Sequence, residues 1–473
     1  MAEVDAVVVG AGPNGLAAAA FLARAGASVV LLEADDTLGG GTRSTDDLTL
    51  PGVVHDICSA VHPFGAGSPA FDALDLGAHG LAWCHPDVTV GHPLAPGTAV
   101  LGVRDVGGTA DGLGVDAGTY RAWFDRPARR WDDLADDLLG PLLRVPRHPF
   151  LAAEVGLRAL LPATTLASRL RTTEARALFA GMAAHAILPL ESPLTASFGL
   201  LLGAAGHANG WPVARGGSQA IADALLSVLR AAGGEVRTGV RVASLSDLPT
   251  CRVALLDVTP RQLVDIAGTH LHPRMRRAAE GWRYGPGAFK LDLAVEGGVP
   301  WTVDGLRRAG TVHLGGTLEQ IAHAERMVHE GVVVDEPYVL LAQQSVADPS
   351  RAVGDVHPVW AYCHVPNGWT GDATEHILGS VERHAPGFRD RIVGSHTWSP
   401  AAFEAHDANY VGGDIAGGSH GGLQLLGRPR LALDPYRTGT PGLFLCSSST
   451  PPGGGVHGMP GMHAAASALR ALG

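Results

Sequence analysis

The apolar residues of the chain fall into short unbroken runs separated by stretches with helical spacing, a pattern typical of α/β proteins. Residues 6–9 form the run AVVV, which is rich in β-branched side chains, as in strands buried inside a parallel sheet. Residues 15–25 are spaced as an alanine-rich helix, and residues 27–33 form a second apolar run. The chain is therefore expected to begin with a strand, a helix and a second strand.

Later segments continue this pattern. The segment 212–245 indicates a loop, an amphipathic helix and a strand, and apolar runs predict sheet strands over 251–260 and 443–446. A glycine-rich turn and a helix of small residues follow the last of these strands. Residues 288–295 alternate in the manner of a strand from a half-buried sheet.

Glycines and an acid stand at the points where a dinucleotide site needs them. Gly10, Gly12 and Gly15 form GxGxxG between the first strand and the helix, and Glu33 ends the second strand. In such a motif the first glycine makes a tight turn, the second lets a pyrophosphate approach the backbone, and the third allows close helix packing. The helix N-terminus attracts the phosphates, and the acid accepts hydrogen bonds from a ribose. The order of elements indicates dinucleotide binding.

The composition of the chain argues against several other functions. The formal net charge of −11 argues against nucleic-acid binding, which needs a basic surface. Five scattered cysteines without a CxxC pair argue against a dithiol centre or a zinc site, and the 22 histidines show no metal-ligand spacing. We therefore predict no metal site. The unpaired cysteines, the absence of a leader pattern and the absence of a membrane-spanning run together predict a cytoplasmic protein.

The residues after Glu33 and Ala34 narrow the choice of dinucleotide. Gly39 and Gly40 form a pair just beyond the acid, and Thr42 and Arg43 follow. This arrangement resembles the second fingerprint of the FAD family that includes flavin amine oxidases and carotenoid desaturases, so the resemblance implies FAD. Those relatives commonly carry an arginine directly after the glycine pair, whereas this chain has a glycine there and Arg43 two residues later.

The resemblance extends over essentially the whole chain. The segments that carry it include AHAILPLESPLTASFGLLL, HANGWPVARGGSQAIADAL, AGTVHLGG, WAYCHVPNG, VGGDIAGG and PPGGGVHGMPG. They resemble the phytoene-dehydrogenase-related flavoproteins, and most of all the subgroup named after pyridine nucleotide-disulfide oxidoreductase domain-containing protein 2. No second GxGxxG stands between a strand and a helix, so FAD is the only cofactor that the sequence supports.

The resemblance also implies roles for residues outside the two fingerprints. In the related flavoproteins, a valine at the place of Val242 lies against adenine through its backbone. A C-terminal turn and helix contact the flavin there, which assigns that contact to five residues of this chain: Ser447, Val456, His457, Gly458 and Met459. The place of His457 beside the flavin also makes it a candidate for proton transfer.

Lys290 is the only lysine of the chain. It lies on the predicted strand 288–295, and in flavin amine oxidases a lysine on the equivalent strand holds a water at flavin N5. A compact ammonium suits such a contact better than a planar guanidinium. We therefore predict a catalytic role for Lys290, against the alternative of an ordinary strand lysine.

These observations predict an α/β fold in which a GxGxxG-initiated, FAD-binding Rossmann-like domain is interleaved with a substrate domain of mixed sheet and helices. The FAD-binding domain is expected to comprise residues 1–75, 212–268 and 428–473, and the substrate domain residues 76–211 and 269–427.

The resemblance implies an FAD-dependent oxidoreductase that removes a hydride from, or desaturates, an apolar small molecule of polyene or lipid-like type, with oxygen or a quinone reoxidising the flavin. The apolar helical segment 150–190 is either ordinary helix packing or the wall of an apolar tunnel that makes peripheral contact with a membrane. Two alternatives for the activity are a redox-neutral double-bond isomerase and a non-catalytic flavoprotein that acts through protein partners.

Overall fold

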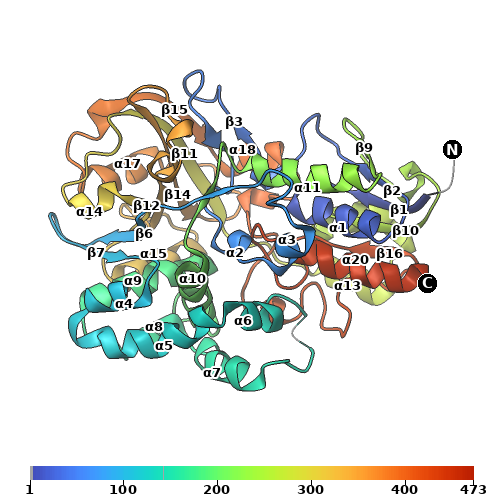
Figure 1. The fold of residues 1–473 in the computed structure, drawn as a ribbon, viewed down its shortest axis with the longest axis horizontal. Coiled ribbons are helices and arrows are strands. Elements are labelled where there is room, and N and C mark those ends of the chain that lie inside the picture. Colours follow the sequence, from blue (N-terminus) through green and yellow to red (C-terminus); the bar gives the residue numbers. More distant parts are fainter. Residues whose placement is uncertain (1–3, 142) are drawn as a thin grey trace.

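A parallel sheet of five strands and a mixed sheet of seven strands organise the chain. Figure 1 shows the two sheets on opposite sides of the molecule. The computed structural model describes residues 4–141 and 143–473. The parallel sheet has the strand order β16-β10-β1-β2-β9. Its strands are β1 (Val4–Val9), β2 (Val29–Leu32), β9 (Glu235–Arg237), β10 (Cys251–Leu256) and β16 (Leu443–Leu445). With helix α1 (Pro13–Arg24) between β1 and β2, the expected start of the chain is confirmed.

Helices cover both faces of the parallel sheet. The helices α1, α11 (Gln219–Ala231) and α20 (Met459–Leu472) pack on one face, and α12 (Pro260–Ala267) and α13 (Pro273–Glu280) on the other. The approach of α20 to α1 requires a glycine, because a Cβ at Gly461 would lie 2.1 Å from the carbonyl oxygen of Asn14. The first turn of α1 and the start of α20 are thereby held side by side.

The predicted strand that includes Val242 is shorter than the sequence pattern indicates. Strand β9 ends at Arg237, and the chain turns at Gly239, which has a φ of +67°. Here the Gly239 N–H donates to the Asp35 carbonyl at 3.0 Å and the Val240 N–H to the Glu33 carbonyl at 2.8 Å. These bonds tie the segment to the end of β2 and leave Val242 in a loop. Its side chain is buried in the apolar cluster beneath the sheet.

The mixed sheet has the strand order β15-β11-β14-β13-β12-β6-β7. Its strands are β6 (Val88–Pro93), β7 (Ala99–Gly102), β11 (Gly287–Glu296), β12 (Ala309–Leu314), β13 (Val339–Ala342), β14 (Val356–Val365) and β15 (Ile392–Trp398). All neighbours are antiparallel except β6 and β12. These strands lie within residues 76–211 and 269–427, and those of the parallel sheet lie within the other segments named above.

Strand β11 is buried on both faces, so the prediction of a half-buried strand is wrong. Phe289, Leu291 and Leu293 pack into an aliphatic core on one side, while Lys290 and Asp292 on the opposite side are also buried. The segment 55–56 covers that second side, since Lys290 Nζ donates to the Asp56 carbonyl and His55 Nδ1 lies 3.5 Å from Asp292 Oδ1, which explains why alternating residues are all inaccessible to water. Helices α9 (Thr173–Ala183) and α10 (Thr195–Asn209) belong to the apolar cluster on this side of the sheet.

The apolar segment 150–190 is helical, as expected. It forms α7 (Pro149–Ala159), α8 (Ala163–Ala167) and α9, and Figure 1 shows these helices beneath the mixed sheet. On α7, Phe150 is 84% exposed and Leu157 71%. Within residues 4–141 and 143–473, no helix is both long and apolar enough to cross a membrane. A peripheral membrane contact stays a prediction.

The remaining elements are short or lie at the periphery. The helices among them are α2 (Pro63–Ala66), α3 (Pro69–Leu74), α4 (Val106–Asp111), α5 (Ala117–Arg129), α6 (Trp131–Leu138), α14 (Asp304–Arg307), α15 (Leu318–His329), α16 (Gln344–Ala347), α17 (Thr374–Glu382), α18 (Pro400–His406) and α19 (Leu423–Leu426). Two small sheets pair β3 (Ser44–Thr45) with β4 (His55–Asp56) and β5 (Trp83–Cys84) with β8 (Val213–Ala214).

A buried carboxylate joins these parts. Asp56 Oδ2 accepts a hydrogen bond from Arg351 Nη1 at 2.8 Å, and Oδ1 accepts from the Ser218 N–H and the Ser44 hydroxyl, each at 2.7 Å. The Asp56 carbonyl accepts from Lys290 Nζ at 2.9 Å. Burial alone would raise the pKa of Asp56, but Arg351 and these donors outweigh it and lower the pKa. The group is therefore ionised at neutral pH.

Removing this charge should destabilise the fold. In Asp56→Asn, the side chain keeps its shape but removes one of the two carboxylates that pair with the fully buried Arg351 guanidinium, leaving only Asp348 at 3.3 Å. Breaking a buried ion pair typically costs about 3–5 kcal/mol. We expect a loss of at least about 2 kcal/mol in the free energy of unfolding, measured by urea titration at pH 7. Asp46→Asn, at an exposed acid, serves as the control; equal stability of both variants would contradict the role of Asp56.

Candidate functional site

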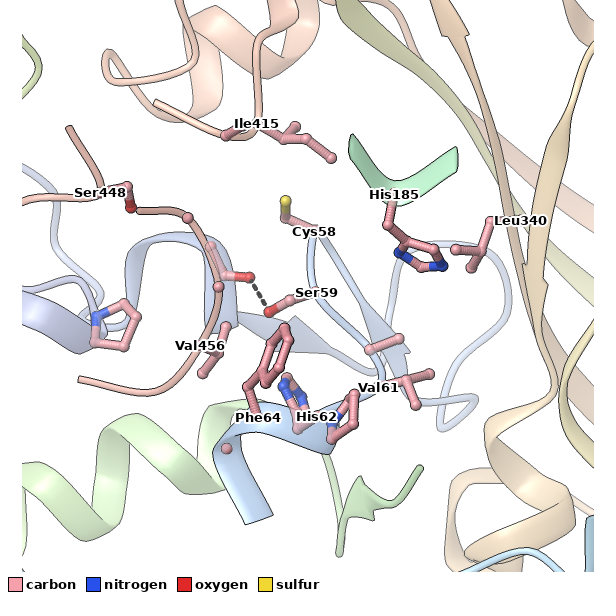
Figure 2. Close-up of a pocket in the computed structure, with 18 of the residues that line it drawn as sticks. Cys58, Ser59, Val61, His62, Phe64, His185, Leu340, Ile415, Ser448 and Val456 are labelled. Atoms are coloured by element: carbon pink, nitrogen blue, oxygen red, sulfur yellow. Dashed lines mark hydrogen bonds between the residues drawn. The ribbon is translucent and has the colours of Figure 1, made fainter. Parts of the chain in front are cut away.

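A cavity of about 310 Å³ lies between the two sheets. At one end it is lined by the start of α1, through Gly12, Pro13 and Asn14, and at the other by the mixed sheet. Figure 2 shows the segment from Cys58 to Phe64 along the cavity, with Val456 on one side and His185 and Leu340 on the other. The cavity thus runs from the predicted phosphate site to the substrate domain.

The GxGxxG glycines are required by close backbone packing. Gly10 has a φ of +96°, and a Cβ at Gly15 would lie 2.0 Å from the Gly10 carbonyl oxygen. A Cβ at Gly12 would lie 2.9 Å from Oδ2 of Asp257. The first turn of α1 therefore presents bare backbone to the cavity, and first-turn N–H groups have no partner within a helix.

Asp257, which was not among the predicted site residues, lies at the centre of this end. It follows β10, and its Oδ2 accepts a hydrogen bond from the Gly15 N–H at 2.8 Å. Burial, reinforced by the nearby acids Asp407 and Glu33, raises the pKa of Asp257 to about 8. At neutral pH its carboxyl is protonated. Its position after a buried parallel strand is a signal that sequence reasoning missed, because ligands bind at the carboxyl ends of such strands.

Glu33 is fixed at the end of β2. Its Oε2 accepts from the Ala11 N–H at 2.7 Å and its Oε1 from the Asp35 N–H at 2.9 Å. Asp35 in turn pairs with Arg43, at 2.8 Å between Oδ2 and Nη1. Arg43 Nε is buried and has no partner among the residues that the structure describes. Arg43, which lies beside these acids, therefore retains an N–H for a ligand.

The second fingerprint folds against the first. The Gly39 N–H donates to the Ala11 carbonyl at 2.9 Å, and a Cβ at Gly40 would lie 3.1 Å from the Gly12 Cα. The glycine at position 41, where relatives carry arginine, has a structural reason: a Cβ there would lie 2.1 Å from the hydroxyl of Tyr410. The Thr42 hydroxyl donates a hydrogen bond to the Gly39 carbonyl at 2.8 Å. Ala34 follows Glu33 in the same loop.

The C-terminal turn reaches the cavity through Val456, which lines it together with Ser448 and Gly455. The other predicted residues of this turn are buried behind the lining: Ser447, His457, Gly458 and Met459. His457 Nδ1 accepts from the Met459 N–H at 3.2 Å, and burial lowers the pKa of His457 to about 4. The ring is therefore neutral at physiological pH, and its catalytic role stays a prediction.

Lys290 lies beneath the cavity and does not line it. Its Nζ donates to Oδ2 of Asp292 as well as to the Asp56 carbonyl, and it lies 5.6 Å from the ring centroid of Trp360, a lining residue. Burial lowers the pKa of Lys290, and Asp292 opposes that shift. Its contact with a flavin stays a prediction.

Two groups of lining residues carry no sequence motif and were missed. One is the segment 58–65, held against the C-terminal turn because a Cβ at Gly65 would lie 2.8 Å from the Val456 carbonyl oxygen. The other lies on the mixed sheet and the helices over it: His185, Phe198, Leu202, Trp211, Thr311, Leu340, Trp360 and Tyr362. Among the described residues, no three His, Cys, Asp or Glu side chains are placed to hold a metal ion.

Comparison with known proteins agrees with this geometry. Residues 8–76 match the family described as NAD(P)-binding Rossmann-like domain. The chain is 26% identical to pyridine nucleotide-disulfide oxidoreductase domain-containing protein 2 of the rat, over 99% of this chain and 94% of the rat protein. The mouse protein of the same name gives the same identity and coverage. The chain is thus similar to these two proteins over nearly its whole length.

Solved structures show the same fold at lower identity. Putrescine oxidase bound to putrescine covers 99% of both chains at a TM-score of 0.63 and 18% identity. Cyclohexylamine oxidase from Brevibacterium oxydans covers 100% of this chain and 99% of its own, at 0.60 and 14%. An oxidoreductase from Methanosarcina mazei covers 98% and 100%, at 0.62 and 16%. The chain therefore has the two-sheet α/β fold of these oxidases, as predicted. Its five cysteines are all free thiols.

The raised pKa of Asp257 predicts how stability depends on pH. The folded chain holds this proton up to about pH 8, whereas the unfolded chain releases it near pH 4, so stability falls between these values. Asp257→Asn removes that titration and keeps an acceptor for the Gly15 N–H. We expect the stability of wild type relative to the variant to fall by about 1–3 kcal/mol between pH 6 and 8 in urea unfolding, because all other groups titrate alike in both proteins. Asp265→Asn, at an exposed acid of α12, is the control; the same pH profile in wild type and Asp257→Asn would refute the prediction.

Proposed function

We propose that this oxidoreductase binds FAD and removes a hydride from an apolar molecule of polyene or lipid-like type. The observation that carries the proposal is the single cavity that joins the GxGxxG loop and the C-terminal turn to the inner face of the mixed sheet. A cofactor held at the loop and a substrate held at the sheet would meet inside it, away from water.

The residues present fit FAD. Bare glycine backbone and the Asn14 N–H at the start of α1 would hold the pyrophosphate, and the protonated Asp257 could donate to a phosphate oxygen. Asn14 lines the cavity, and its amide has an oxygen with no partner among the described residues. Turned over, that amide would offer N–H groups to a phosphate. Glu33 would hold the ribose, Val242 would back the adenine, and the turn at Val456 would meet the flavin.

When bound, the flavin supplies the hydride acceptor, and oxygen or a quinone would reoxidise it. The chain itself excludes water and positions the substrate. Phe198, Leu202 and Leu340 give the substrate end apolar walls. Burial lowers the pKa of His185 to about 3, so this lining residue stays neutral.

The structural relatives named for putrescine and cyclohexylamine do not by themselves make this chain an amine oxidase. Of the described lining residues, the acids are Asp257 and Asp407. Both lie at the dinucleotide end, since a Cβ at Gly12 would be 2.9 Å from Asp257 Oδ2 and one at Gly40 would be 3.5 Å from Asp407 Oδ2. An ammonium at the substrate end would lack a counter-charge. This supports an uncharged substrate.

Flavin binding can be tested at Gly12. We expect the purified protein to be yellow and to release all its colour as FAD on acid precipitation. In Gly12→Ala the new methyl group would meet Asp257 and enter the pyrophosphate site, so FAD content should fall at least tenfold while the far-UV circular dichroism spectrum stays that of a folded chain. Gly118→Ala, where a Cβ meets no atom within 4 Å, is the control. Full FAD content in Gly12→Ala would place the phosphates elsewhere.

The role of Lys290 can be separated from its structural ion pair with Asp292. Lys290→Met alone strands a buried carboxylate, whereas Lys290→Met with Asp292→Asn removes both charges. If the ammonium assists flavin oxidation, both variants should be reoxidised by oxygen roughly tenfold more slowly than wild type after photoreduction. Lys290→Arg should not restore the rate.

The double variant provides the decisive comparison. A purely structural Lys290 would make the single variant unstable but would leave the double variant with wild-type stability and a wild-type reoxidation rate. That outcome, measured by stopped-flow absorbance on samples of equal FAD content, would reject a catalytic role.

A further inference from the structure

The inner face of the mixed sheet differs from its outer face. Pairing across three strands places Thr311 of β12, Ala342 of β13 and Trp360 of β14 in one row, since Thr311 pairs with Ala342 and Ala342 with Trp360. The next row contains His313, Leu340 and Tyr362. The outer face of the same strands is aliphatic. Ala342, which has the smallest side chain of the three, lies between Thr311 and Trp360 in this row.

Two polar atoms in this row are unpaired. Trp360 Nε1 and Thr311 Oγ1 are both buried, and neither has a hydrogen-bond partner among the residues that the structure describes. Both residues line the cavity. Buried donors are nearly always paired in native proteins, because an unpaired one loses its hydrogen bonds to water without replacement. Two such atoms in one row of the cavity lining indicate a ligand atom that forms hydrogen bonds with them.

The charges around Trp360 and Thr311 limit the charge that this ligand atom can carry. Lys290 and Asp292 lie on the two neighbouring positions of β11, opposite Tyr362 and Trp360, and neutralise each other. The lining histidines are neutral at physiological pH: burial lowers the pKa of His62 to about 4, and those of His185 and His420 to about 3. Neither a cation nor an anion has a counter-charge here.

We propose that the substrate carries a neutral oxygen, as a carbonyl or hydroxyl group, on an otherwise apolar body, and that Trp360 Nε1 and the Thr311 hydroxyl hold this oxygen. The indole N–H can only donate, so the ligand atom is an acceptor, and the hydroxyl of Thr311 can donate to it or accept from it. This inference rests on the proposed function and narrows it: a pure hydrocarbon would leave both polar atoms unpaired.

The test compares two probes of matched shape, acetophenone and ethylbenzene, which differ by a carbonyl oxygen in place of two hydrogens. Binding to the purified FAD-containing protein is measured by calorimetry for wild type, Trp360→Phe and Thr311→Val. We expect wild type to bind acetophenone roughly tenfold more tightly than ethylbenzene, and each variant to reduce that preference to about twofold with ethylbenzene unchanged. Trp123→Phe, which removes an indole N–H from a buried tryptophan outside the lining, should keep the wild-type preference.

Two results would overturn the proposal: equal affinity of wild type for the two probes, or variants that weaken both probes by the same factor. The two substitutions act on different strands, so a folding defect in one leaves the other informative, and thermal melts identify such a defect. Absorbance at the flavin band is recorded on the same samples. Absent FAD would refute the proposed function, whereas present FAD without oxygen preference would refute only this inference.

Discussion

The buried carboxylate of Asp56 ties together segments that are far apart in the sequence. Through Arg351 it reaches the Ala214 carbonyl, to which Nη2 donates at 2.7 Å, and through Ser218 it reaches the start of α11. Its own carbonyl holds Lys290 on the mixed sheet. The cavity exists because these connections fix the mixed sheet opposite the parallel one. The ion pair and the hydrogen bonds of Asp56 together outweigh the free-energy cost of burying its charge.

The dinucleotide end of the cavity concentrates acidic side chains. Glu33, Asp35, Asp257 and Asp407 gather where a pyrophosphate would add further negative charge, and Arg43 is the cation that faces them. The structure reduces the conflict by keeping Asp257 protonated. Burial likewise raises the pKa of Asp407. Affinity for a phosphate ligand at this end would therefore depend on protons as well as on the helix dipole.

Local patterns in the sequence predicted much of the fold. The strand–helix–strand start, the strands at 251–260 and 443–446 and the helical segment 150–190 follow from apolar spacing within a few residues. The predictions failed where the interacting residues lie far apart in the sequence. Asp257 and Gly15, which form a hydrogen bond, are 242 positions apart in the sequence, and Asp56 and Arg351 are 295 positions apart. Local spacing of residues carries no information about such contacts. Burial of both faces of β11 depends on residues from elsewhere in the chain, such as His55 and Asp56, and the row formed by Thr311 and Trp360 exists only once three strands are paired.

The single lysine has a chemical consequence for the whole surface. Lys290 is 1% exposed, so every exposed basic side chain of the folded protein other than histidine is a guanidinium. Reagents that acylate lysine amines find none on the folded surface, and the same amine becomes reactive when the mixed sheet opens. Acylation of Lys290 is thus a built-in label for unfolding, and its absence from the surface leaves the folded molecule without lysine sites for amine-directed cross-linking.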